Sequence, residues 1–433
     1  LLRKGILNEI VAAQGWGVRW KLSHCVGNTD GLAEAIVEIT DNSKRQEVFR
    51  LYCDKKLENK FVRYYFRTLF YEFGKDNYLQ YVNELKAISD KDICVVLYAP
   101  DIVQEITHIV DGLPVQIQKE YWENVGLWGL TDENVLYTIE RLRSVGRYSD
   151  ILNFVHNKAL KPYISGALWL EILIDCFDNG HMAALSQDSY DVAEILKCIQ
   201  IPSNPVAKGK LLLLELALFE RISLYLSQSE CHLLNLVNNE PEMMMEIVKL
   251  AYLEDEEYRD DQDLTEVERD NKIVLAKLAC NFLFHYHSVP GMWQDGTIDE
   301  NFLREYLVQL KVCAERCHRI HIIPMITGKI IGNMPETDDY PSDLMCELVE
   351  EYADDRIDCE ISCCISNRRG TSSRSAYAGG DIERSHIETF KTYLNRTLTR
   401  SPRLTKVFES EIKSYESMAA RQDVEGKLND LRY

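Results

Sequence analysis

Apolar residues recur at spacings of three and four along most of the chain, a period typical of amphipathic helices. In one clear example, Val135, Ile139 and Leu142 form an apolar stripe, Gly146 ends it, and a second stripe begins at Ile151. A short glycine-containing turn brings consecutive helices back alongside each other. We therefore predict an antiparallel helical hairpin at this point in the chain.

The same pattern predicts further helices, and short polar residues mark several helix starts because their side chains satisfy free backbone donors. In the hairpin above, Thr131 or Asp132 is predicted to cap the first helix, and Ser149 or Asp150 the second. The other predicted helical segments are 166–178, 190–199, 209–228, 241–253, 266–287, 298–318, 341–355, 382–398 and 402–430.

Extended segments are few. Residues 92–99 fit a strand or the start of a buried helix equally well, and 358–366 alternate partly and are expected to extend briefly. Helices joined by short connections predict an all-α fold. Because the hairpins differ in length, we predict an irregular α-solenoid or helical-hairpin array, a degenerate relative of tetratricopeptide or HEAT repeats, with a compact helical C-terminal domain.

Breaks in this pattern predict three segments: an N-terminal helical-repeat segment 1–205, a middle helical segment 206–288 with an acidic loop at 254–270, and a C-terminal helical domain 289–433. Proline and glycine mark the first boundary. At the second, an Asp295–Gly296 turn precedes a helix that Thr297 or Asp299 is predicted to cap.

Composition narrows the class of protein. The 433 residues carry a net charge of −20, which disfavours the whole chain as a binder of nucleic acid or of anionic membranes. No window approaches the length of apolar sequence that a membrane span needs. The 13 irregularly spaced cysteines do not resemble a disulfide framework, so we expect a reducing, cytoplasmic location.

Motifs for metal or phosphate chemistry are weak. Cys313, Cys317 and His321 could share a helix face, but on a straight helix they climb about 12 Å and cannot surround one ion. The pair His285 and His287 is better explained as helix-end residues. The "ITGKIIG" stretch lacks the first glycine and the Ser or Thr of a phosphate loop. We predict no catalytic residue, no metal and no cofactor.

An aromatic run at 63–74 has arginines interleaved with it, as in platforms on which single-stranded nucleic acid stacks. The spacing of Tyr65, Leu69 and Phe73, however, suits packing inside a helical core equally well. Both interpretations stay open at this point.

The strongest candidate for ligand contact is the basic Gly/Arg/Ser loop 362–384. Residues 367–406 hold nine Lys or Arg against three acids, a local charge of +6. Guanidinium groups suit phosphate or carboxylate, and glycines permit close approach to the backbone. Asp381 is predicted to cap the following helix, and the arginines could instead pair with acids of neighbouring helices. The candidate anion- or partner-binding residues are Arg368, Arg369, Arg374, Gly379, Gly380 and Arg384.

Three stretches, 5–22, 112–152 and 293–426, resemble the C-terminal helical-repeat region of large, mostly uncharacterised bacterial proteins. Those proteins are similar in layout to antiphage sensors of the STAND-NTPase type, in which a helical-repeat half recognises a viral component. The resemblance implies a sensor role and brings no catalytic residues with it.

Together these features predict a non-enzymatic protein-interaction or sensor scaffold with a protein partner. The alternative is a nucleic-acid or nucleotide-sensing module that uses the basic region 367–406. Because the chain starts with Leu1 in the middle of a helical pattern, we expect it to be part of a larger protein.

Overall fold

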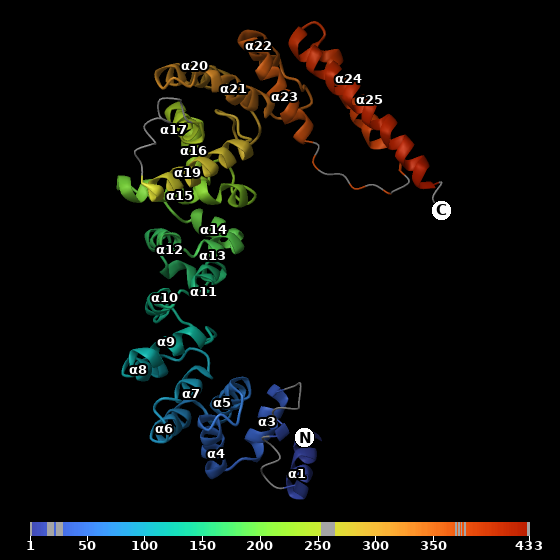
Figure 1. The fold of residues 1–433 in the computed structure, drawn as a ribbon. Coiled ribbons are helices and arrows are strands. Elements are labelled where there is room, and N and C mark those ends of the chain that lie inside the picture. Colours follow the sequence, from blue (N-terminus) through green and yellow to red (C-terminus); the bar gives the residue numbers. More distant parts are fainter. Residues whose placement is uncertain are drawn as a thin grey trace. The chain divides into compact units, whose positions relative to one another are not determined.

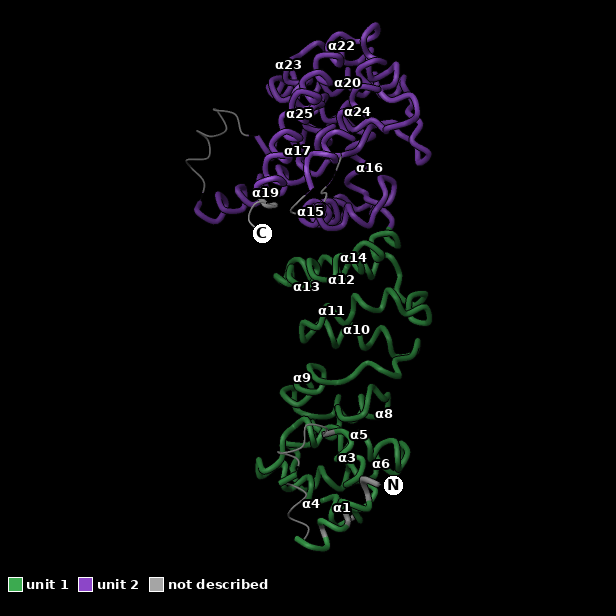
Figure 2. The backbone as a smooth tube through the Cα atoms, turned by 90° about the vertical axis from the view of Figure 1, so that its right-hand side faces the viewer, with its two compact units in different colours: residues 1–199 green, residues 200–433 purple. Residues whose placement is uncertain are grey.

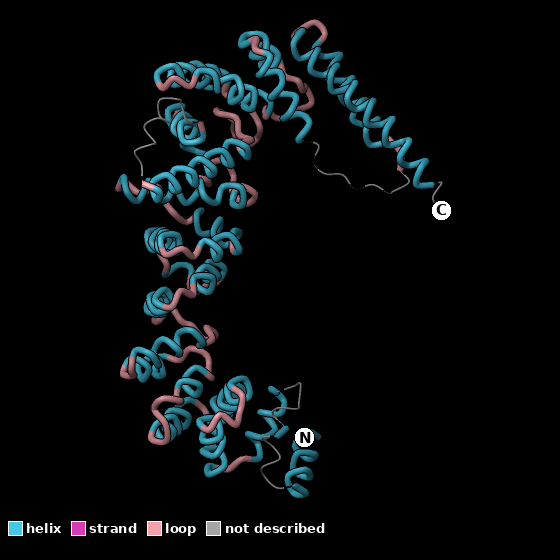
Figure 3. The backbone as a smooth tube through the Cα atoms, viewed as in Figure 1, coloured by secondary structure: helices cyan, strands magenta, loops and turns pink. Residues whose placement is uncertain are grey.

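The computed structural model describes residues 2–14, 21–22, 29–252, 265–368, 370, 373, 375 and 378–430. In these residues the regular secondary structure is helical (Figure 1, Figure 3), and β-structure is limited to two isolated bridges. The predicted all-α array of helices is confirmed. Its closer likeness to tetratricopeptide or HEAT repeats stays a prediction.

The chain forms two compact units, residues 1–199 and residues 200–433 (Figure 2). The division into three segments predicted from the sequence stays a prediction. None of the helices in the described ranges combines the length and apolar character needed to cross a membrane.

Unit 1 is built from short helices, and many of those in its described ranges are separated by only a few residues. Its α-helices are α1 (Leu2–Gln14), α3 (Thr29–Ile39), α4 (Asn42–Cys53), α5 (Asn59–Phe73), α6 (Lys75–Lys86), α7 (Cys94–Tyr98), α8 (Gln104–Asp111), α9 (Val115–Asn124), α10 (Val135–Ser144), α11 (Tyr148–Leu152), α12 (Gly166–Asp178), α13 (Met182–Gln187) and α14 (Ser189–Leu196).

The aromatic run of α5 belongs to the core of unit 1. Tyr65, Phe66 and Leu69 are fully buried, and the Phe66 ring packs edge-on against Phe49 of α4 at 6.3 Å between centroids. Edge-to-face packing of this kind is a favoured arrangement for buried rings. Of the two interpretations of this run, core packing is therefore confirmed for these residues.

Two arginines hold the predicted hairpin of unit 1 to its neighbours. Arg143 pairs with Glu171 at 2.8 Å and Asp175 at 2.9 Å, which joins α10 to α12. Arg147 donates to the carbonyl oxygens of Trp122 at 3.0 Å and Val125 at 2.8 Å, and so satisfies carbonyl groups at the end of α9. Such contacts replace the hydrogen bonds that a helix end lacks.

Unit 2 contains longer helices. They are α15 (Pro205–Ile222), α16 (His232–Asn239), α17 (Pro241–Ala251), α19 (Glu266–His285), α20 (Glu300–Arg316), α21 (Ile323–Gly332), α22 (Asp343–Tyr352), α23 (Asp355–Arg368), α24 (Asp381–Thr397) and α25 (Pro402–Asp430). The last two lie side by side (Figure 1), with the Phe390 ring of α24 packed on Tyr415 of α25 at 5.2 Å between centroids.

A buried polar network ties the middle of unit 2 together. The Asn238 side chain donates to Ser288 Oγ at 2.7 Å and accepts from the Tyr286 hydroxyl at 2.7 Å. The Tyr306 hydroxyl of α20 donates to the Val237 carbonyl oxygen at 2.8 Å. Because these buried polar groups have partners, they carry no desolvation penalty from an unmade hydrogen bond.

Several local predictions are wrong. Residues 358–366 are helical within α23, because buried Ile357, Ile361 and Ile365 follow a helical period that outweighs the partial alternation. For 92–99, where strand and helix were both left open, the helical alternative is confirmed by the short helix α7. The predicted caps of the α10–α11 hairpin are also wrong, since α10 starts after Asn134 and α11 after Arg147, without a capping side chain at either start.

Candidate functional site

The predicted basic loop is shorter than expected, because its first residues, 362–368, complete α23. Arg368, the last residue of α23, donates to the carbonyl oxygens of Gly332 and of Met334 and pairs with Glu336 at 3.3 Å. Its guanidinium carbon also lies 5.4 Å from the centroid of the Tyr340 ring. Arg368 therefore holds the end of α23 to the connection that follows α21.

Arg369 and Arg374, the two other arginines predicted for this site within the loop, lie outside the described residues. Their role as anion- or partner-binding residues stays a prediction.

The glycines at the end of the loop pack against α25. A Cβ on Gly379 would lie 2.4 Å from Asp423 Oδ1, and one on Gly380 would lie 2.5 Å from the Ala419 backbone. The Gly380 N–H donates to Asp423 Oδ1 at 2.8 Å. These two glycines thus permit a close approach between chain segments rather than a phosphate cradle.

Arg384 completes this contact. It pairs with Asp381 at 2.7 Å and with Asp423 at 3.0 Å, and its hydrogen bonds lower the pKa of Asp423 to about 2. Asp381 is the first residue of α24 and Gly380 precedes it without a capping side chain, so the predicted Asp381 cap is wrong. The carboxylate bonds to Arg384 instead.

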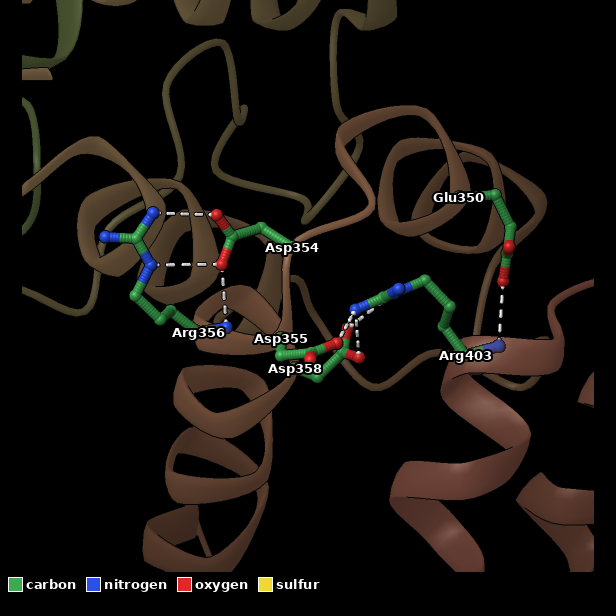
Figure 4. Close-up of polar contacts among 6 residues, drawn as sticks. All are labelled: Glu350, Asp354, Asp355, Arg356, Asp358 and Arg403. Carbon is green, nitrogen blue, oxygen red and sulfur yellow. Dashed lines mark hydrogen bonds and ion pairs between the residues drawn. The ribbon is translucent and has the colours of Figure 1, made fainter. Parts of the chain in front are cut away.

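Arg403 at the start of α25 joins three helices (Figure 4). Its guanidinium reaches Asp355 and Asp358 of α23, each at 2.7 Å. Its backbone N–H donates to Glu350 of α22 at 2.9 Å. Close by, Arg356 pairs with Asp354 at 2.8 Å.

The described arginines of the basic region are therefore engaged by the chain's own carboxylates and carbonyl oxygens. Arg396 and Arg400 fit the same description, since they contact the Tyr340 carbonyl oxygen and Asp343. Of the two interpretations of this region, the arrangement favours the structural one. Arg384 pairs with an acid of a neighbouring helix, Asp423 of α25, as the structural interpretation expects, whereas Arg368 bonds mainly to carbonyl oxygens of Gly332 and Met334.

The cysteine and histidine candidates are separated by the end of a helix. Cys313 is buried in α20, Cys317 follows the last residue of that helix, and His321 lies in a 3-10 turn beyond it. His285 ends α19, as predicted. Across the described ranges, no group of three or more His, Cys, Asp or Glu residues could hold a metal ion.

The glycines of "ITGKIIG" lie inside α21 and face α23. A Cβ on Gly328 would lie 2.7 Å from Glu360 Cβ, and one on Gly332 would lie 2.8 Å from Cys364 Cβ. Glycines four residues apart let two helix backbones approach closely. Lys329, between them, donates to the carbonyl oxygens of Leu283 and Phe284 at the end of α19, and burial lowers its pKa.

A different feature of unit 2 has the form of a binding site. It is a groove of about 1030 Å³ between the connection after α15, the helix α16, the connection before α20 and the first turn of α20. We call it the Trp293 groove. Its lining residues are Ser227, Gln228, Ser229, Asn235, Asn239, Gly291, Met292, Trp293, Gln294, Asp295, Asp299 and Phe302.

A tight turn presents Trp293 to solvent. The Trp293 N–H donates to the Thr297 carbonyl oxygen at 2.8 Å, and Gly296 occupies the left-handed region at φ +83°. The Asp299 N–H donates to the Gly291 carbonyl oxygen at 2.9 Å, which closes the base of the turn. Trp293 is 66% exposed although the backbone that carries it is well held.

The acids of the groove have defined local roles. Asp299 accepts from the Phe302 N–H at 3.0 Å and caps α20, which confirms one of the two predicted caps. Asp295 accepts from the N–H and hydroxyl of Thr297, and these hydrogen bonds lower its pKa. Asp295 is therefore ionised at neutral pH, and the lining includes two acids and no lysine or arginine.

Sequence reasoning placed a turn at Asp295–Gly296 and a boundary nearby, but it did not propose a site there. One feature of the sequence could have indicated a site: Trp293 lies next to turn residues and outside the apolar stripe of any helix. The other walls of the groove come from residues some 60 positions earlier, and no sequence pattern joins them to Trp293.

Comparison with known protein families, with characterised proteins and with solved structures finds no significant match for this chain. The resemblance to helical-repeat regions of bacterial sensors stays a prediction.

Proposed function

We propose that this chain is a non-enzymatic protein-binding scaffold and that the Trp293 groove holds an extended segment of a partner protein. One observation carries the proposal: an exposed tryptophan on a turn held by backbone hydrogen bonds lines an open groove whose surface is mainly apolar and whose wall also includes amide and hydroxyl side chains. Exposed tryptophans of this kind are enriched among the residues that dominate binding energy at interfaces.

The lining suits a peptide backbone. Asn235, Asn239 and Gln228 supply side-chain amides. The Asn239 amide nitrogen donates to the Asn235 carbonyl oxygen and to Asn235 Oδ1, so Asn239 offers its side-chain oxygen as an acceptor and Asn235 its amide nitrogen as a donor to peptide units. Met292 and Phe302 add apolar surface beside Trp293. The volume of about 1030 Å³ lies at the upper end of the range for small-molecule sites, which fits several residues of a chain better than a small ligand.

The charge of the groove selects the partner segment. Because Asp295 and Asp299 are lining residues and the whole chain carries −20, complementarity favours a segment in which Lys or Arg flanks an apolar anchor. The resemblance of three stretches to bacterial sensor proteins supports a wider form of the proposal. In that form the chain is the recognition region of a larger bacterial protein with an antiphage role.

Selection from a displayed library of random peptides, with the full chain as target, tests this function. Selected peptides should combine an apolar anchor with Lys or Arg. Trp293→Ala should weaken their binding by about 2 kcal/mol, or roughly 30-fold. Trp128→Ala is the matched control, because Trp128 is 79% exposed in unit 1. Peptides that bind Trp293→Ala as tightly as the parent chain would show that the groove is not the binding surface.

A further inference from the structure

A second cavity lies within unit 1, where α5 presents its polar face. Lys60, Arg63 and Arg67 stand three and four residues apart on this helix, so they share one side of it. The opposite side carries the buried aromatic core described above. A helix with this division displays three cations in a row on its outer surface.

The cavity measures about 420 Å³ and is lined by residues of α5 and by the last residues of α7 and α9. Besides the three cations, its wall includes the amides of Asn59 and Asn124 and the rings of Tyr64 and Tyr98. No carboxylate is among the residues that line it. We call it the α5 pocket.

Several contacts fix the wall of the α5 pocket. The buried Tyr98 hydroxyl donates to Asn59 Oδ1 at 2.8 Å, so the amide nitrogen of Asn59 is the group with hydrogens to donate to a ligand. The Arg63 guanidinium carbon lies 5.6 Å from the centroid of the Tyr98 ring, within range of a cation–π interaction. These contacts limit the motion of the groups that a ligand would meet.

The three cations differ in how their charge is balanced. Arg67 pairs with Asp101 at 3.2 Å, and the Tyr71 hydroxyl donates to the same carboxylate oxygen at 3.0 Å. Asp101 is itself held by the bridge to Gly126. Lys60 and Arg63 make no ion pair with any residue in the ranges that the structure describes. The pocket thus holds two cations that form no ion pair in the described ranges, in a chain of net charge −20. The acid near them is Asp101, the partner of Arg67, which lies beside Gly126 together with Arg63.

We propose that the α5 pocket binds a small phosphate-bearing molecule. Lys60, Arg63, Asn59 and Asn124 offer more N–H groups than one carboxylate can accept, and a phosphate accepts at three oxygens with a charge near −2. Guanidinium forks match phosphate geometry. The volume exceeds that of the anion alone and leaves room beside Tyr64 for an organic group.

Isothermal titration of the full chain at low ionic strength tests this site with three probes: pyrophosphate, adenosine monophosphate and glucose 6-phosphate. Adenosine and glucose are the uncharged counterparts, and citrate is the carboxylate control. We expect binding of at least one phosphate probe that weakens roughly 10- to 100-fold in Arg63→Ala and in Lys60→Ala, since each variant removes a charged donor. Lys60 is exposed, so its replacement leaves the core intact.

Arg50→Ala, which changes an exposed arginine of α4 in the same unit, should bind the probes like the parent chain. Tightest binding by pyrophosphate would identify the inorganic anion as the ligand, and tighter binding by either ester would identify an organic phosphate; both support the proposal. No binding by any phosphate probe, equal binding by citrate or adenosine, or binding unchanged by Arg63→Ala and Lys60→Ala would overturn it.

Discussion

Glu215 is the buried carboxylate on which the start of α16 depends. It lies in α15 with no exposed surface, and its Oε1 accepts from the His232 N–H at 3.2 Å and bonds to His232 Nδ1 at 2.7 Å. Its Oε2 accepts from the Leu233 N–H at 2.5 Å. Because α16 has no capping side chain of its own, Glu215 supplies the acceptor that helix starts normally find locally.

The expected cost of removing Glu215 follows from these contacts. Glu215→Ala leaves the His232 and Leu233 N–H groups without the acceptor that Glu215 supplies, and each buried donor left unsatisfied costs about 1–3 kcal/mol, so we expect about 2–6 kcal/mol in total. Glu215→Gln keeps one carbonyl oxygen but turns an amide group toward an N–H donor, so we expect about 1–3 kcal/mol. Glu215→Ala should therefore lower the free energy of unfolding more than Glu215→Gln does.

Urea denaturation of the full chain followed by circular dichroism measures the change in unfolding free energy. Hydrogen exchange followed by mass spectrometry shows which helices lose stability. Peptides from α16 should exchange faster in Glu215→Ala, whereas peptides from α12 in unit 1 should not change. Since α16 carries Asn235 and Asn239, the same variant should weaken peptide binding in the Trp293 groove.

Glu220→Gln, on the exposed side of α15, is the matched control and should change stability by less than about 0.5 kcal/mol. The reasoning is refuted if Glu215→Ala costs less than about 1 kcal/mol. It is also refuted if the alanine and glutamine variants are equally destabilised, or if faster exchange spreads evenly over unit 2.

Two further predictions concern the helix contacts of unit 2. Gly332→Ala should cost about 1–3 kcal/mol in urea denaturation because the new Cβ would lie 2.8 Å from Cys364 Cβ. Gly209→Ala, where nothing lies within 4 Å, should instead stabilise the chain by up to about 1 kcal/mol, and equal effects would contradict the packing argument. A double-mutant cycle between Arg403→Ala and Asp358→Ala should give a coupling of about 1 kcal/mol that shrinks with added salt, and a coupling of zero would show that this ion pair does not join α23 to α25.

The helices themselves were predictable because each one buries a stripe of its own sequence. The predicted segments 166–178 and 402–430 coincide with α12 and α25, and each of the others overlaps a helix. Some failures occurred where the helix is short, whereas α21 and α23 were missed although both bury several isoleucines. α13 and α16 were not predicted, since six to eight residues give too few turns for a period to stand out.

The pairing of the basic region could not be predicted, because it depends on which helices meet. Asp423 lies 39 residues from Arg384, and Asp358 lies 45 residues from Arg403. A sequence gives only the sum of the charges in a stretch. Whether that stretch attracts an anion depends on which charged side chains the fold leaves without an ion-pair partner. The local charge of 367–406 is +6, but the described arginines of this region bond to acids and carbonyl oxygens of neighbouring segments.

The α5 pocket shows the converse effect. Its cations are few, and the sequence hides them inside an aromatic run whose obvious signal is the buried face of the helix. A helix has two sides, however, and the residues that interrupt an apolar stripe are the ones that face outward. Arg63 and Lys60 interrupt such a stripe, and the surrounding segments bring amides and tyrosines to them rather than acids. If the α5 pocket binds phosphate, sparse cations that the fold leaves without ion pairs mark an anion site better than the dense basic run 367–406 does. The titrations of Arg63→Ala and Arg50→Ala test that distinction directly, because both variants remove one positive charge from unit 1 and only one of them lies in the pocket.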